Sequence, residues 1–168
     1  MDLKEYVDRM KNLRPGNELA INGIPFAVTD ERTHIHSDRS DELLWTRMSI
    51  RRVRRRVATR QSQTWLEVPG LLNDAYTVHV SRYLGVYKGS AVRQASAPIA
   101  WQGRTHLAAY GREISFVGAR SVMAGEFIVY SPLHGESRRL RLEKMVDETA
   151  WQVHEVTPIG RDKVSFAR

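Results

Sequence analysis

Residues 18–29 read ELAINGIPFAVT. Two runs of alternating apolar side chains flank Asn22 and Gly23, the dipeptide that most readily adopts the two positive φ angles of a type I′ turn. We therefore predict a β-hairpin here, with strands over residues 18–21 and 24–29.

The segment before this hairpin predicts a short amphipathic helix within residues 1–13. Its apolar side chains recur at helical spacing; they are Leu3, Tyr6, Val7 and Met10. Asp2, with Glu5 three residues later, resembles a capping box, and Pro15 with Gly16 is expected to stop the helix.

Period-two alternation recurs after the hairpin and predicts further strands. We expect them at residues 64–68, 75–84, 98–101, 105–110, 113–117, 125–130, 140–146 and 150–156, with residues 43–60 forming a strand that leads into an irregular basic loop. Residues 33–42 are polar and predict a loop or a mobile hairpin tip, and residues 160–168 are expected to fray. The fold class is therefore mainly β: an antiparallel barrel or sandwich of about eight to ten short strands with one N-terminal helix.

Length and composition favour one globular domain. The 168 residues are 42% hydrophobic and 27% charged, and none is cysteine, which excludes disulfides and thiolate metal sites. We predict a single β-rich domain over residues 14–159, with two lobes that meet near residues 85–97 as an alternative. Because residues 1–5 lack the features of a secretory leader, we expect a cytoplasmic protein, or one peripheral to the inner membrane.

The positive charge is concentrated in one stretch. The chain has 26 Lys and Arg against 19 Asp and Glu, and seven of these bases lie between Leu43 and Leu66, where there is no acid. The other 19 bases balance the 19 acids. The seven form what we call the arginine run: Arg47, Arg51, Arg52, Arg54, Arg55, Arg56 and Arg60. Guanidinium groups favour bidentate contacts with phosphates and carboxylates, so the run predicts a partner-binding surface, although a simple solvated segment fits equally.

Several short pieces occur in a recognisable order. They are LRPG (13–16), NGIPFAV (22–28), Trp45, WLEV (65–68), QGRT (102–105), Gly125 and Glu126 with Tyr130, LRLE (140–143), and Trp151 with Glu155. Over about residues 13–157 this order resembles a bacterial family known as domain of unknown function 4178. The resemblance implies a compact β-rich module without established catalytic activity, of a kind often encoded near phage-shock-like membrane-stress proteins and polyamine-related enzymes. Residues 51–60 are not part of the family pattern, so it assigns the arginine run no role.

Common catalytic and phosphate-binding motifs are missing from the sequence: no Gly-rich phosphate loop, no G-x-S-x-G and no H-E-x-x-H occurs. We therefore expect no catalytic residue and no cofactor. A weak metal candidate remains, because His34, His36 and Asp38 have spacings used in cupin-like and iron sites, with His106 or His134 as a distant third ligand.

Charged and aromatic residues also fall within predicted strands. Outward carboxylates would keep a sheet soluble, whereas inward pairs could have raised pKa values suited to acid–base chemistry; the candidates are Glu113, Glu126, Glu143 and Glu155. We expect Arg138, Arg139 and Arg141 to form ion pairs with Glu136 and Glu143. Core packing is the expected role of the four tryptophans, which are Trp45, Trp65, Trp101 and Trp151.

These observations lead to three functional hypotheses. The first is a non-enzymatic accessory module that docks an acidic protein or anionic membrane surface through the arginine run, in a bacterial stress-response system. The second is a small nucleic-acid-binding β-barrel, which the run supports electrostatically but without interleaved aromatic side chains. The third is a metal-dependent cupin-like enzyme built around His34, His36 and Asp38.

Overall fold

The computed structural model describes residues 1–30, 32–53, 63–71, 77–91, 97–133 and 138–167. Within these ranges the chain is mainly β, with one N-terminal helix and twelve strands. The helix is α1 (Leu3–Lys11), and a short 3₁₀ turn is η1 (Arg161–Lys163). The strands are β1 (Glu18–Ile21), β2 (Ile24–Val28), β3 (Thr33–Ser37), β4 (Leu43–Arg52), β5 (Thr64–Pro69), β6 (Val78–Tyr87), β7 (Pro98–Trp101), β8 (Arg104–Val117), β9 (Val122–Pro132), β10 (Arg139–Met145), β11 (Trp151–Ile159) and β12 (Val164–Phe166).

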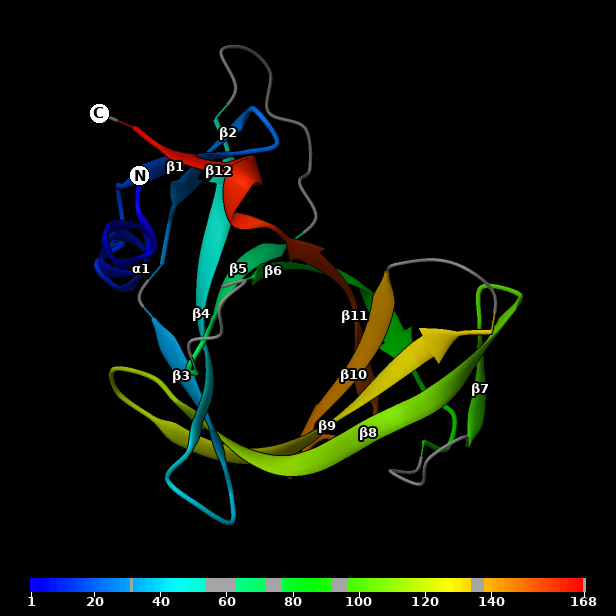
Figure 1. Cartoon of the computed structure of the whole chain (residues 1–168). Coiled ribbons are helices and arrows are strands. Elements are labelled where there is room, and N and C mark those ends of the chain that lie inside the picture. The colour runs from blue at the N-terminus through cyan, green and yellow to red at the C-terminus, as the bar shows by residue number, and fades with distance from the viewer. Residues whose placement is uncertain (31, 54–62, 72–76, 92–96, 134–137, 168) are drawn as a thin grey trace.

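Eight of these strands close into an antiparallel barrel (Figure 1). Their order around the barrel is β4-β3-β8-β9-β10-β11-β6-β5, and pairing of β5 with β4 closes the circle. The predicted fold class is therefore confirmed, with the barrel rather than the sandwich. β7 pairs with β8 outside the barrel.

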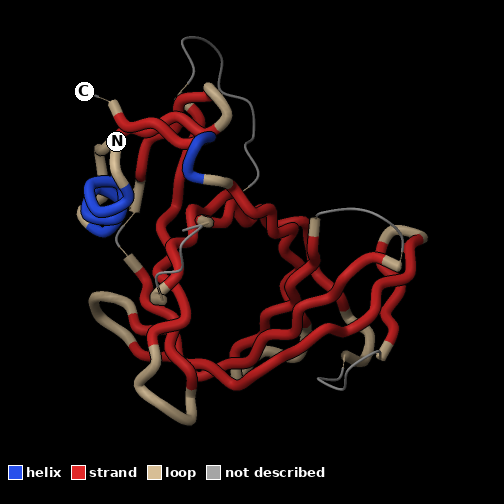
Figure 2. Tube along the Cα trace, in the orientation of Figure 1, coloured by secondary structure: helices blue, strands red, loops and turns tan. Residues whose placement is uncertain are grey.

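The two ends of the chain form a second group of elements, which we call the terminal lobe: α1, β1, β2 and β12. It continues the sheet beyond the barrel, because the last residues of β4 pair with β2, which is followed by β1 and β12 (Figures 1 and 2). Helix α1 begins as predicted, since the Asp2 side chain accepts a hydrogen bond from the Glu5 backbone N–H at 2.8 Å.

The predicted hairpin of residues 18–29 is confirmed as β1 and β2. Asn22 has φ 51° and Gly23 has φ 74°, the left-handed values that a type I′ turn requires. The turn between β7 and β8 has the same geometry, with Gln102 at φ 49° and Gly103 at φ 74°.

Three segments differ from prediction. The two strands predicted at residues 105–110 and 113–117 are one continuous strand, β8. Residues 33–37 are the barrel strand β3, not a loop, because fully buried Ile35 supplies a core contact while polar residues flank it. The C-terminal tail was predicted to fray, but residues 164–166 form β12, whose buried Val164 joins the core and whose backbone pairs with β1. Short strands with only one or two inward-facing residues show little alternation of apolar and polar side chains. Neither of these two strands could therefore be predicted from the sequence pattern.

Apolar side chains are buried on both sides of the barrel wall. Met48 and Leu66 join the core beneath the terminal lobe, whereas their neighbours Arg47 and Glu67 lie on the opposite strand face. A second core lies between β7 and strands β8 to β11, and a third contains Ile35, Phe116 and Phe127. No helix in the described ranges has the length and apolarity needed to cross a bilayer.

Candidate functional site

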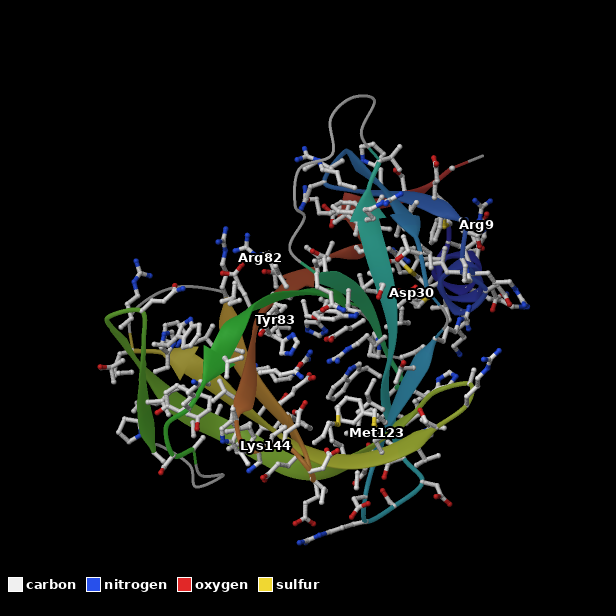
Figure 3. The ribbon with its side chains drawn as sticks, turned by 180° about the vertical axis from the view of Figure 1, so that it is seen from behind. Arg9, Asp30, Arg82, Tyr83, Met123 and Lys144 are labelled. Carbon is white, nitrogen blue, oxygen red and sulfur yellow. The ribbon has the colours of Figure 1, made fainter. Side chains whose placement is uncertain are left out.

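Because side chains alternate between the two faces of each strand, an unusual set of charged residues points into the barrel interior, which we call the lumen. Arg47 on β4 lies directly opposite Glu67 on β5 in the antiparallel register. Arg141 and Glu143 on β10 are two residues apart, so their side chains share one strand face. Polar side chains are visible inside the ring of strands when the barrel is seen from behind (Figure 3).

These four residues form a closed circuit of alternating charge, which we call the four-charge ring. Arg47 donates from Nε to Glu67 Oε1 at 3.1 Å and from Nη1 to Glu143 Oε2 at 3.0 Å. Arg141 donates from Nη1 to Glu67 Oε2 at 2.8 Å and from Nε to Glu143 Oε1 at 2.6 Å. Each cation therefore contacts both anions, and the ring joins β4 and β5 to β10.

Neighbouring side chains hold the ring in place. The Arg47 guanidinium lies 5.4 Å from the ring centroid of Trp65, and the Arg141 guanidinium lies 4.9 Å from that of Trp45. The hydroxyl of buried Ser81 donates to Glu67 Oε1 at 2.9 Å. These contacts satisfy buried charges that would otherwise be costly to remove from water.

Mutual neutralisation fixes the protonation states of the ring. Burial alone would raise the pKa of Glu67, but Arg141 and Arg47 outweigh burial and lower it to about 2. Burial would likewise raise the pKa of Glu143, and Arg47 and Arg141 again hold it well below its usual range. Both carboxylates are ionised at neutral pH and are poorly suited to act as general acids or bases.

His154 on β11 lies beside the ring, with its Nε2 atom 3.6 Å from Glu143 Oε2. Burial and the nearby Arg141 and Arg47 outweigh the attraction of Glu143 and lower the pKa of His154 to about 4. The imidazole is therefore neutral at pH 7. It packs between Trp65 and Tyr83, at centroid distances of 5.2 and 5.9 Å.

A cavity of about 850 Å³ occupies the lumen on one side of the ring. Glu67 and Arg141 of the ring contribute to its lining. The other lining residues come from seven of the eight barrel strands and the adjoining turn: Glu42, Leu44, Trp45, Pro69, His79, Tyr110, Arg112, Phe127, Val129, Ser131, Pro132, Arg139, Val156 and Pro158. Nine of the sixteen lining residues are apolar or aromatic and seven are charged or polar, so the lining is amphipathic.

The three described members of the arginine run do not share one surface. Arg47 points into the lumen, where its side chain is 11% exposed and bonded to Glu67 and Glu143, so it is removed from the predicted partner-binding surface. Arg51 and Arg52 are exposed at the end of β4. The remaining members, Arg54, Arg55, Arg56 and Arg60, lie outside the described residues.

The weak metal candidates are only partly brought together. His34 and His36 lie on β3 with ring centroids 6.4 Å apart, and His34 Nδ1 is 3.0 Å from the Thr46 hydroxyl. Asp38 accepts a hydrogen bond from Ser115 at 3.2 Å. Among the described residues, no group of three potential ligands could hold a metal ion. His106 is buried on β8, and His134 lies outside the described ranges.

The predicted carboxylates divide between the two strand faces. Glu155 is partly exposed and pairs with Arg82 at 3.1 Å, whereas Glu143 is buried in the ring. The expected pairing of Arg141 with Glu143 is confirmed. Sequence reasoning missed Glu67, and the one available signal was an acid between two apolar residues, Leu66 and Val68, in a predicted strand.

No family model, no curated protein and no solved structure matches the chain. The resemblance to domain of unknown function 4178 therefore stays a prediction.

Proposed function

We propose that this protein is a non-enzymatic binding protein that holds a small amphipathic molecule in the barrel lumen. The observation that supports this proposal is the cavity of about 850 Å³ above the four-charge ring. Eight-stranded barrels are just wide enough to accommodate one small ligand, and binding sites for such ligands have volumes of roughly 300–1,000 Å³.

The chemistry of the ring favours binding over catalysis. Glu67 and Glu143 each bond to both arginines, and their lowered pKa values keep them ionised. The ring therefore serves as a rigid polar floor, while Trp45, Phe127 and Val129 supply apolar walls.

A neutral apolar dye, N-phenyl-1-naphthylamine, tests this proposal by fluorescence titration. We expect saturable binding to the wild type and at least tenfold weaker binding to Val156→Phe, because the larger side chain fills part of the cavity. Val129→Phe provides a second lumen variant should the first unfold. The matched control is Val146→Phe, at a side chain that is 77% exposed. An absence of dye binding, or equal binding by all folded variants, would contradict the proposal.

A second candidate function is docking of an acidic protein or anionic membrane surface through the exposed part of the arginine run. Arg51 and Arg52 support it, because both are exposed and neither has a carboxylate partner within the described ranges. The sequence continues from them into Arg54, Arg55 and Arg56. Nucleic acid is the alternative partner, since phosphates attract the same surface.

Binding assays at several salt concentrations distinguish these partners. The probes are poly-glutamate, vesicles containing phosphatidylglycerol, and DNA and RNA oligonucleotides. We expect the variant with Arg51, Arg52, Arg54, Arg55 and Arg56 changed to Ser to lose binding to poly-glutamate or the vesicles. A control variant removes five exposed bases elsewhere: Lys4, Lys11, Lys88, Arg120 and Arg161. Equal affinities of both variants would remove the docking hypothesis, and binding to oligonucleotides alone would favour the nucleic-acid alternative.

A further inference from the structure

The charges that line the cavity do not cancel. Arg141 and Glu67 belong to the neutral four-charge ring, and Arg112 at the rim lies 3.8 Å from Glu42. Arg139 also lines the cavity, and it has no carboxylate partner among the residues that the structure describes. Among the described lining residues, one positive charge is therefore left over.

Arg139 and His79 line the same part of the wall, on β10 and β6, the two strands that flank β11. Arg139 pairs with Val156 on β11, and His79 pairs with Pro158 two residues further along that strand. Burial is the largest influence on the pKa of His79 and lowers it. Arg141 and Arg139 lower it too, and together these influences outweigh Glu67, which raises it. The imidazole is thus neutral at pH 7 and offers a hydrogen-bonding nitrogen on the same part of the wall as the Arg139 guanidinium, which has no carboxylate partner in the described ranges.

Apolar groups begin directly beside this polar pair. Val156 and Pro158 lie along β11 between Arg139 and His79, and Phe127 and Val129 continue the wall on β9. Arg139 is exposed, so an anionic head placed there would remain partly hydrated while its apolar body enters the lumen.

We propose that the lumen selects an amphipathic monoanion, with its carboxylate at Arg139 and His79 and its apolar body against Phe127 and Val129. This inference rests on the proposed function and specifies the class of ligand. A guanidinium binds a carboxylate through two parallel hydrogen bonds, which a neutral amide of the same shape does not reproduce.

The test compares 1-naphthylacetate with its neutral amide, 1-naphthylacetamide, by calorimetry and by displacement of N-phenyl-1-naphthylamine. We expect the wild type to bind the carboxylate at least tenfold more tightly than the amide. Arg139→Gln should bring the two affinities within about twofold of each other while leaving affinity for the amide unchanged.

Arg138→Gln is the matched control. It removes the same charge one residue earlier, from a side chain that is 60% exposed and lies 3.8 Å from Glu155. It should retain the preference for the carboxylate. Equal affinities of the wild type for both compounds, or equal effects of the two substitutions, would overturn the assignment of the ligand class.

His79 provides a second readout, measured by NMR titration of its imidazole. A bound anion beside the ring favours the protonated form, so 1-naphthylacetate should raise the pKa of His79 and the amide should leave it unchanged. Dye binding without a preference for the carboxylate would overturn the ligand class alone. Failure of the dye and of both naphthyl compounds to bind would overturn the proposed function as well.

Discussion

Glu67 and Glu143 each hold two guanidinium groups inside the barrel, so the consequences of losing one carboxylate are severe. Removal of one member of a buried ion network leaves a charge without a partner in a site that water does not fully reach. Exposed ion pairs contribute far less, because solvent screens both charges.

Glu67→Gln is therefore expected to lower the free energy of unfolding by about 3–5 kcal/mol. Glu155→Gln, which removes the exposed contact with Arg82, should change it by less than about 1 kcal/mol. Urea denaturation of both variants measures the difference. Similar losses in the two variants would show that the ring is not buried as described.

His154 makes stability depend on pH in a defined window. Its pKa is lowered from 6.5 to about 4 in the folded protein, so the unfolded state takes up a proton first as the pH falls. Stability is thus fully present above pH 6.5 and is lost progressively between pH 6.5 and 4. The lowered pKa of Glu67 acts at lower pH, between about 4.5 and 2, and overlaps the His154 window only near its lower end.

We expect His154→Phe to remove a few kcal/mol of this pH dependence, because phenylalanine retains the aromatic contacts but does not titrate. The comparison uses the free energy of unfolding at pH 7.5 and 4.5 for the variant and the wild type. The pKa values of His34 and His79 are also lowered. Their contributions to the pH dependence of stability are the same in the variant and the wild type, so they cancel when the two proteins are compared. An unchanged pH dependence would mean that His154 is accessible to water in the native state.

At the scale of elements, tight turns set the register of the hairpins. Gly23 has φ 74° with nothing within 4 Å of an added Cβ, so only backbone strain opposes a side chain there. Gly23→Ala should therefore cost about 1–2 kcal/mol. Gly118→Ala is the control, since its φ is not in the left-handed region and its added Cβ would lie 3.7 Å from the Ser121 carbonyl oxygen. Thermal unfolding measures both, and equal effects would argue against the type I′ geometry.

Elements with strong local signals could be predicted from the sequence. Helix α1, its Asp2 cap and the β1–β2 hairpin depend on residues close together in the chain. The β3 strand could not be found in this way, because His34 and His36 flank its single fully buried residue, Ile35. Strand β12 has only three residues, and its pairing partner β1 lies at the opposite end of the sequence.

The four-charge ring depends on pairing between residues that are far apart in the chain, so most of it could not be predicted from the sequence. Arg47 and Glu143 are 96 residues apart, and their contact follows only from closure of the barrel. In the sequence, Arg47 is a member of the arginine run. In the structure, side chains alternate between the two faces of β4, so Arg47 points into the lumen and Arg52 lies on the opposite face. Local composition therefore identified the charge but not the direction in which each side chain points.

The whole molecule combines a closed barrel with a lobe built from both chain termini. The terminal lobe covers apolar outer faces of β4 and β5, which leaves the inner faces of these strands to carry charged residues. The four-charge ring ties opposite walls together and forms the floor of the lumen cavity. The core beneath the terminal lobe thus lies on the outer side of the barrel wall, whereas Phe127 and Val129 of the third core also line the cavity.

Methyl NMR spectroscopy of the full chain with 1-naphthylacetate tests the central claim most directly. Val129 and Val156 line the cavity, whereas Val122 and Val146 are 70% and 77% exposed on the outside. We predict nuclear Overhauser contacts from the naphthyl ring to Val129 and Val156 and none to Val122 or Val146. Contacts confined to the outer valines, or no contact at saturating ligand, would contradict the account of the lumen as a binding site.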